Sequence, residues 1–180
     1  MRATCAVAVA VDEINSEGIS RACILGTRAL VETLAYYGIT AKPLSVDLLA
    51  ANAPALKAMD EGIPQEEWPE DWWTVGVDGT VDWDGSGYNG HLVAVAGTTL
   101  MDPTAEQFHR PDKGIHIPAP LVGEYHPEHR AVAYEADHGS AIVYRPAKRR
   151  DWHSAPAWRL RSRYGPIAAR AISYLNEEGT

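Results

Sequence analysis

The chain has 180 residues, of which 46% are hydrophobic and 22% charged, and its formal net charge is −8. This composition predicts one globular domain over residues 1–180. Binding to nucleic acid or to an anionic membrane needs clustered positive charge, so the acidic balance argues against both partners. The basic segment 145–163 departs from this balance. A solvated surface is its simpler interpretation, and a docking site for an acidic partner is the alternative.

Two cysteines, Cys5 and Cys23, are too few for a disulfide framework, which favours a reducing, cytoplasmic setting. The apolar run Cys5–Val11 is far too short to span a membrane, and acidic residues follow it at once. We expect it to belong to a buried first element. Residues 3–17 as a whole fit a helix better than a buried strand, although short apolar runs suit both.

A second helix is expected over about residues 21–37. Apolar side chains recur at helical spacing from Leu30 to Ala35, and Gly38 ends the pattern. The segment 39–49 then predicts a strand, and Pro43 places this strand at a sheet edge or a bulge.

The middle of the chain is rich in glycine, proline and tryptophan, and it predicts irregular structure with a short helix at Ala53–Asp60. Residues 91–102 predict a hairpin whose turn is centred on Gly97-Thr98. Residues 103–128 are expected to be mostly loop.

A second hairpin is expected over residues 130–146, with its turn at 137–139. The last helix should follow Pro156 or Pro166 and run to about Asn176. Helices, then an antiparallel sheet, then a helix define an α+β domain: a helix-packed antiparallel sheet.

Cys23 opens the second predicted helix and is the candidate nucleophile. A thiol becomes a good nucleophile when a helix N-terminus or a neighbouring imidazole stabilises the thiolate. The first predicted turn offers free backbone amides and the positive end of the helix dipole. These amides could also donate to an oxyanion. Taken alone, Cys23 would most simply be a packing residue.

The first hairpin can supply the partners of this thiol. If its turn is centred on Gly97-Thr98, the numbers of facing residues add up to 195, and Val93 faces Asp102. His91 lies on the same face as Val93, because side chains alternate along a strand. His91 and Asp102 are then diagonal neighbours, within reach of an imidazole–carboxylate contact. A loop of odd length would place them on opposite faces.

Three stretches carry a family resemblance: Cys23 with the pattern C-x6-L-x3-L-x3-GI-x-A, then GHLVAVAG, then LMDPT. Together they resemble the transglutaminase-like superfamily of papain-like cysteine enzymes, over about residues 15–108. The resemblance implies a transglutaminase-like fold with the nucleophile at a helix N-terminus. It also implies a triad of Cys23 as nucleophile, His91 as general acid/base and Asp102 as orienting carboxylate.

Further residues are weaker candidates for the same site. Trp72 and Trp73 lie in an acidic, proline-bounded loop, where they could line a peptide site or pack in a core. Tyr88 lies in the glycine-rich stretch before His91, and we expect it to contact substrate. Candidate side chains for an oxyanion donor are Asn15, Ser20 and Tyr88.

Metal and cofactor sites are not expected. The pair His126 and His129, with other histidines nearby, could suggest zinc, but Pro127 disfavours the regular helix that would present both rings. The stretch 80–85 matches a calcium loop at three positions, but His91 stands where the bidentate glutamate belongs.

The favoured function is a cysteine peptidase or amidase that acts on a peptide or protein substrate through an acyl-enzyme. The same intermediate could be taken by an amine, which would make the protein a transamidase or acyltransferase. A non-catalytic binding module on the same fold is the main alternative. The family commonly carries an aromatic residue two or three positions after the histidine, and here those positions are Val93 and Ala94.

Overall fold

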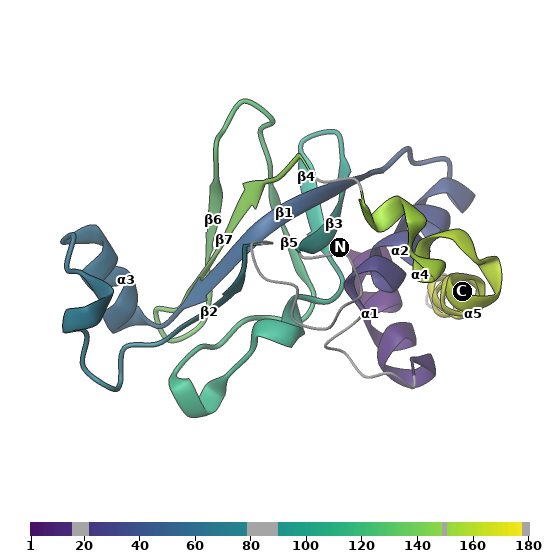
Figure 1. Cartoon of the computed structure of the whole chain (residues 1–180). Helices are drawn as coiled ribbons and strands as arrows, with labels where there is room; N and C mark the ends of the chain where they lie inside the picture. The colour runs from purple at the N-terminus through teal and green to yellow at the C-terminus, as the bar shows by residue number, and fades with distance from the viewer. Residues whose placement is uncertain (16–21, 79–89, 149–150, 178–180) are drawn as a thin grey trace.

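The computed structural model describes residues 1–15, 22–78, 90–148 and 151–177, and it has an α+β architecture. Three helices, α1 (Arg2–Ile14), α2 (Cys23–Tyr36) and α5 (Arg161–Glu177), gather at one end of an antiparallel sheet (Figure 1). The short helix α4 (Pro156–Arg159) precedes α5. Helix α3 (Ala53–Asp60) stands at the opposite end of the molecule, as Figure 1 shows.

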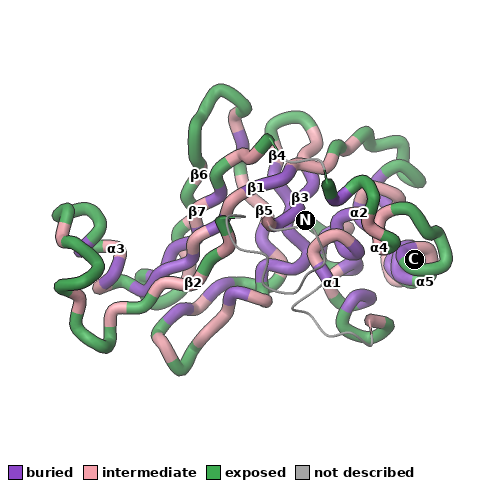
Figure 2. The backbone as a smooth tube through the Cα atoms, in the orientation of Figure 1, coloured by how far each residue is buried: buried purple, intermediate pink, exposed green. Residues whose placement is uncertain are grey.

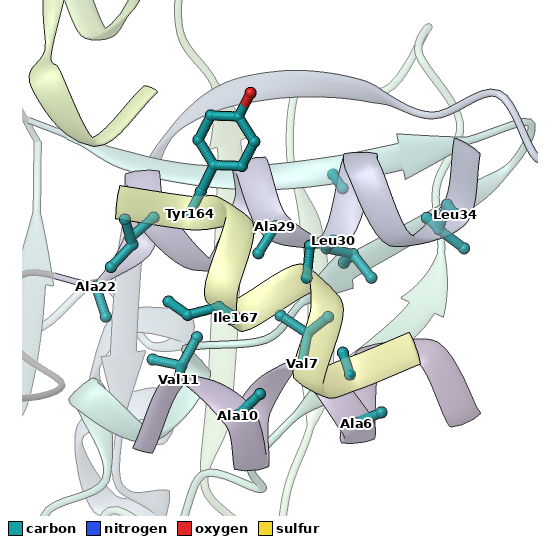
Figure 3. Close-up of a cluster of buried hydrophobic side chains, with 14 of the residues drawn as sticks. Ala6, Val7, Ala10, Val11, Ala22, Ala29, Leu30, Leu34, Tyr164 and Ile167 are labelled. Carbon is teal, nitrogen blue, oxygen red and sulfur yellow. The ribbon is translucent and has the colours of Figure 1, made fainter. Parts of the chain in front are cut away.

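The helical layer has its own apolar core. Small and branched side chains from one face each of α1, α2 and α5 meet there (Figure 3), among them Val7, Leu30 and Ile167, which are almost fully buried. Ala94 and Met101 of the sheet belong to the same cluster, so the helices pack on the outer face of the strands that carry the candidate site. Alanines on these helices allow the close approach that such packing needs.

Over the described residues the sheet has seven strands, and every pairing among them is antiparallel. In chain order they are β1 (Lys42–Ala51), β2 (Thr74–Val77), β3 (His91–Ala96), β4 (Thr99–Asp102), β5 (Leu121–Glu124), β6 (Val132–Glu135) and β7 (Ala141–Pro146). Their spatial order is β5-β4-β3-β1-β7-β6, and β2 also pairs with β1. In the described part of the chain, the connections contain four 3₁₀ turns, Gln65–Glu67, Ala105–Phe108, Pro111–Lys113 and Asp151–Ser154.

The sheet curls into a nearly closed barrel. Its two ends, β5 and β6, are joined by a hydrogen bond of 2.6 Å from the Tyr134 hydroxyl to the Glu124 carbonyl. The Tyr134 ring packs so closely on Gly123 that a Cβ there would overlap it. Inside the barrel lies a second core, which includes Val93, Leu100 and Tyr144. Figure 2 shows β3 and β4 mostly buried, β2 and β6 partly exposed, and the connecting loops largely exposed.

Both predicted hairpins are present. In the first, Ala96 pairs with Thr99 and Ala94 with Met101, which confirms the register that adds up to 195. Gly97 adopts a φ of 58° in its turn, which suits glycine. The second hairpin joins β6 to β7 through a turn in which His138 and Gly139 have φ values of 56° and 73°. The short helix at Ala53–Asp60 is confirmed at both ends.

The expectation that Pro43 marks an edge strand or a bulge is wrong for the strand as a whole, because β1 lies in the middle of the sheet. The proline is tolerated because β7 pairs only with residues 46–51 of β1, so among the described residues the first half of β1 has a strand partner on one side only. Strands β2 and β5 lie in segments expected to be irregular. Among the described residues, no helix combines the length and apolar character needed to cross a membrane.

Candidate active site

Cys23 is the first residue of α2, and it is a free, partly exposed thiol. Ala22 before it is fully buried, and the Gly26 N–H closes the first turn onto the Ala22 carbonyl at 2.7 Å. The first amides of a helix have no acceptor within it, so they present partial positive charge around the sulfur. The helix begins two residues later than expected, which places Cys23 at its very start.

Two contacts fix α2 against the strand and loop that carry the rest of the site. The Thr27 hydroxyl is fully buried and donates to the Leu92 carbonyl of β3 at 2.7 Å. Gly26 faces the Pro103-Thr104 corner so closely that a Cβ on it would lie 2.9 Å from Thr104 Cγ2. The absence of a side chain at position 26 therefore lets the N-terminus of α2 approach this corner.

His91 and Asp102 form a buried pair inside the mouth of the barrel. Nε2 of His91 lies 2.6 Å from Oδ2 of Asp102, and the two side chains are 1% and 0% exposed. His91 begins β3 and Asp102 ends β4, so the hairpin alone brings them together. The prediction that both lie on one face of the hairpin is confirmed.

The Asp102 carboxylate is fully hydrogen-bonded. Its Oδ1 accepts from the Thr104 backbone N–H at 2.9 Å and from the Thr104 hydroxyl at 3.2 Å. Its Oδ2 also accepts from the Tyr144 hydroxyl at 2.9 Å. Burial and the neighbouring Asp102 charge raise the pKa of Tyr144 well above its ordinary value, so this hydroxyl stays a donor. These donors fix the orientation of the carboxylate against the imidazole.

His91 also hydrogen-bonds the Cys23 side chain. Burial opposes the charged imidazolium and lowers the pKa of His91. The Asp102 carboxylate, by its charge and its hydrogen bond, and the Cys23 side chain outweigh burial and raise that pKa to about 10. The Phe108 ring meets the imidazole edge-on, with ring centroids 5.2 Å apart, and covers it with apolar surface. The structure therefore brings all three predicted triad residues together.

Two further residues shape the site without having been predicted. Gly26 is one of them. The other is Gln107, whose Nε2 lies 3.0 Å from Nδ1 of His91. The sequence offers a weak signal for Gly26, since a glycine inside a helical pattern often marks a close approach. Gln107 gives no signal, because it reaches His91 only through the 3₁₀ turn Ala105–Phe108.

The predicted substrate residues Trp72 and Trp73 are not brought to the triad. They precede β2, which pairs with the far end of β1: Thr74 faces Ala51, whereas His91 faces Val46. The intervening residues of an extended strand span roughly 17 Å. A direct contact between these tryptophans and a substrate carbonyl at Cys23 is thus not supported.

Trp73 instead lines a separate hollow of about 430 Å³ at that end of the barrel. The Lys113 ammonium lies 4.0 Å from the centre of its indole ring, and the His116 and His138 rings lie 4.3 Å apart in the same wall. Trp72 packs edge-on against Trp68, with ring centroids 6.2 Å apart.

The remaining candidates stay predictions. Tyr88 and Ser20 lie outside the described residues, as does the stretch 80–85. Asn15 caps the C-terminal end of α1, where its backbone N–H bonds the Val11 carbonyl. Within the described part of the chain, no group of three or more histidine, cysteine, aspartate or glutamate side chains is arranged to hold a metal ion.

The basic segment 145–163, of which residues 149 and 150 lie outside the description, is largely exposed at its charged positions. Arg161 lies 3.7 Å from Glu32 of α2, so part of the charge of this segment is already paired within the fold.

The chain matches no family model, no curated protein and no solved structure.

Proposed function

We propose that this protein is a cysteine-dependent hydrolase of amide or peptide bonds, with Cys23 as nucleophile, His91 as general acid/base and Asp102 as the carboxylate that orients His91. The observation that carries the proposal is one continuous set of contacts. Cys23 at a helix N-terminus hydrogen-bonds His91, and His91 lies 2.6 Å from a fully buried carboxylate. The resemblance to transglutaminase-like enzymes points the same way.

Acylation follows from this arrangement. The thiol proton passes to Nδ1 of His91, because Nε2 is held by Asp102, and the sulfur attacks the substrate carbonyl carbon. The C=O π bond becomes a lone pair on oxygen, and the first amides of α2 are placed to donate to that charge. When the adduct collapses, the C–N bond breaks and Nδ1–H protonates the departing amine. A thioester on Cys23 remains.

Deacylation reverses the roles of the same groups. Water attacks the thioester carbonyl while Nδ1 takes a proton from the water. The C–S bond then breaks, the carboxylic acid leaves, and the proton returns to the sulfur. The buried position of His91, which is 1% exposed, means that a substrate reaches the site from the side of the partly exposed Cys23.

Competitive alkylation of the two cysteines tests the nucleophile. Cys5 is exposed whereas Cys23 is only partly exposed, so exposure alone would make Cys5 react faster with iodoacetamide. An ordinary thiol is almost entirely protonated at pH 6, so a thiolate held by His91 should react roughly 10- to 100-fold faster than Cys5 there. Mass spectrometry of the two peptides gives the ratio. Equal rates, or faster labelling of Cys5, would refute the proposal.

A peptidyl electrophile tests for an amide site rather than a reactive thiol alone. A set of peptide aldehydes and peptidyl chloromethyl ketones should form an adduct at Cys23 in the wild-type protein. The variants His91→Ala and Cys23→Ala should form none at that position. If every peptidyl probe reacts no faster than its parent electrophile without a peptide, the protein has no peptide site, and the binding-module interpretation is favoured.

A further inference from the structure

The Gln107 carboxamide has an orientation that its contacts determine. Its Nε2 lies 3.0 Å from the Thr104 carbonyl oxygen and 3.0 Å from Nδ1 of His91. Turning the amide over would place Oε1 against the Thr104 carbonyl, so that two acceptors would face each other. The group at Nδ1 is therefore the amide nitrogen, which can only donate.

This orientation selects one protonation state of His91. A donor 3.0 Å from Nδ1 is satisfied when Nδ1 carries a lone pair and is opposed when Nδ1 carries a proton. The Gln107 contact therefore stabilises the neutral imidazole, with its proton on Nε2 toward Asp102. Protonation of Nδ1 turns the same contact into two donors facing each other, unless the Gln107 side chain moves away.

The position of Gln107 is built into the site. The chain between Asp102 and Gln107 forms a ring of contacts. Thr104 donates twice to Asp102 Oδ1, and its carbonyl oxygen accepts from the Gln107 side chain and, at 3.2 Å, from the Gln107 backbone N–H. Asp102 and Gln107 thus hold the two ring nitrogens of His91 from opposite sides.

The charged and titratable groups around His91 act in the other direction. Asp102 of β4 faces Nε2, and its negative charge favours the imidazolium. Cys23 of α2 also interacts with His91, and its thiolate also favours the imidazolium. Tyr144 of β7 is an uncharged donor to Asp102, and the Phe108 ring is apolar. Gln107 is the one of these neighbours whose contact favours the neutral ring.

We propose that Gln107 is a positioning residue: by donating to Nδ1 it stabilises neutral His91 against the ion pair with Cys23, and so keeps His91 able to accept the thiol proton. The catalytic meaning of this balance rests on the proposed hydrolase. The hydrogen bond and its effect on His91 do not, and they can be measured without a substrate.

Nitrogen NMR of the protein labelled with ¹⁵N-histidine tests the balance, with His91→Gln used to assign the His91 signals. In Gln107→Glu, a carboxylate of the same size accepts from Nδ1–H instead of opposing it. Gln107→Met removes the donor at similar length. Gln65→Glu is the matched control, because Gln65 is exposed on the turn Gln65–Glu67, away from the site.

In a titration from pH 6 to 11, both Gln107 variants should lose the Nδ1 proton at a higher pH than the wild type, and Gln65→Glu should match the wild type. The alkylation rate of Cys23 falls as the pH is lowered. The pH at which it falls should decrease by about one pH unit in Gln107→Glu and by less in Gln107→Met. If every folded Gln107 variant leaves both readouts unchanged, or moves them toward the neutral ring, the proposal is wrong. If Nδ1 responds as expected but no peptidyl electrophile modifies Cys23, the hydrolase fails and the role of Gln107 in the balance stands.

Discussion

The substitution Asp102→Asn tests the triad most directly, because it changes a charge while keeping the size of the side chain. The asparagine oxygen can still accept both Thr104 donors, which leaves the NH₂ group toward Nε2 of His91 and the Tyr144 hydroxyl. The hydroxyl can rotate and accept. His91 can accept at Nε2 only if its proton moves to Nδ1, and that proton then occupies the atom that must take the proton of Cys23.

The expected loss is large in reactivity and small in stability. A general base that is in the wrong tautomer costs roughly 10²- to 10⁴-fold in turnover. The rearranged buried hydrogen bonds should cost about 1–3 kcal/mol of unfolding free energy. Cys23 in Asp102→Asn should therefore lose its advantage over Cys5 in iodoacetamide labelling at pH 6, while urea unfolding stays cooperative. Asp60→Asn, at the exposed end of α3, is the control. If Asp102→Asn labels Cys23 at the wild-type rate, Asp102 does not orient His91.

Three further substitutions test the packing and the electrostatics around the site. Gly26→Ala should slow Cys23 labelling by about tenfold or more even though alanine favours the helix, because its Cβ would meet Thr104 and displace the start of α2. The control is Gly165→Ala in α5, where the Cβ meets only the flexible Arg161 side chain at 3.2 Å. Equal labelling rates in the two variants would refute this role of Gly26. In Cys23→Ala, His91 still faces Asp102, and this carboxylate keeps the pKa of His91 raised and so favours the folded state. This stability is fully present below pH 6.5 and is lost as the pH rises through the pKa of His91 in the folded variant, at up to about 1.4 kcal/mol per pH unit in urea unfolding. Cys23→Ala/Asp102→Asn, in which burial lowers the pKa of His91, should lack this loss, and an identical pH dependence of the two variants would contradict the assignment. Gly123→Ala should lower the free energy of unfolding by about 1–3 kcal/mol, because its Cβ would overlap the Tyr134 ring. The double variant Gly123→Ala/Tyr134→Ala should lose less than the sum of the two single losses. Strict additivity would mean that this contact does not close the barrel.

The pairing of His91 with Asp102 could be predicted because its geometry is local. A turn at Gly97-Thr98 fixes the register of the hairpin, and the register alone decides that His91 and Asp102 share a face. The apolar spacing and Gly38 place the helix start at Cys23 within a few residues. The hairpin and the helix start each follow from a period of the backbone, whereas the resemblance to transglutaminase-like enzymes joined Cys23 to the hairpin.

What could not be predicted depends on contacts between distant segments. Strand β5 is four residues long and joins the sheet only because β4 offers it an edge, so its own residues carry little periodic signal. The acidic, proline-bounded loop around Trp73 suggests a substrate contact as one alternative, but the pairing of β2 with the far end of β1 takes this residue elsewhere. Gln107 reaches His91 through an irregular turn, for which sequence spacing gives no rule.

The site lies where the two cores of the molecule meet, and this position links stability to reactivity. Cys23 moves with the helical layer, whereas His91 and Asp102 point into the barrel. Tight contact at Gly26 and the Thr27 hydrogen bond hold the two parts in register at the point where the thiol meets the imidazole. A shift of about 1 Å between reacting groups can cost on the order of 10²-fold in rate. If Cys23 is the proposed nucleophile, loosening the helical layer should therefore lower its reactivity well before it unfolds the domain, while the carboxylate–imidazole pair, held within one hairpin, stays intact.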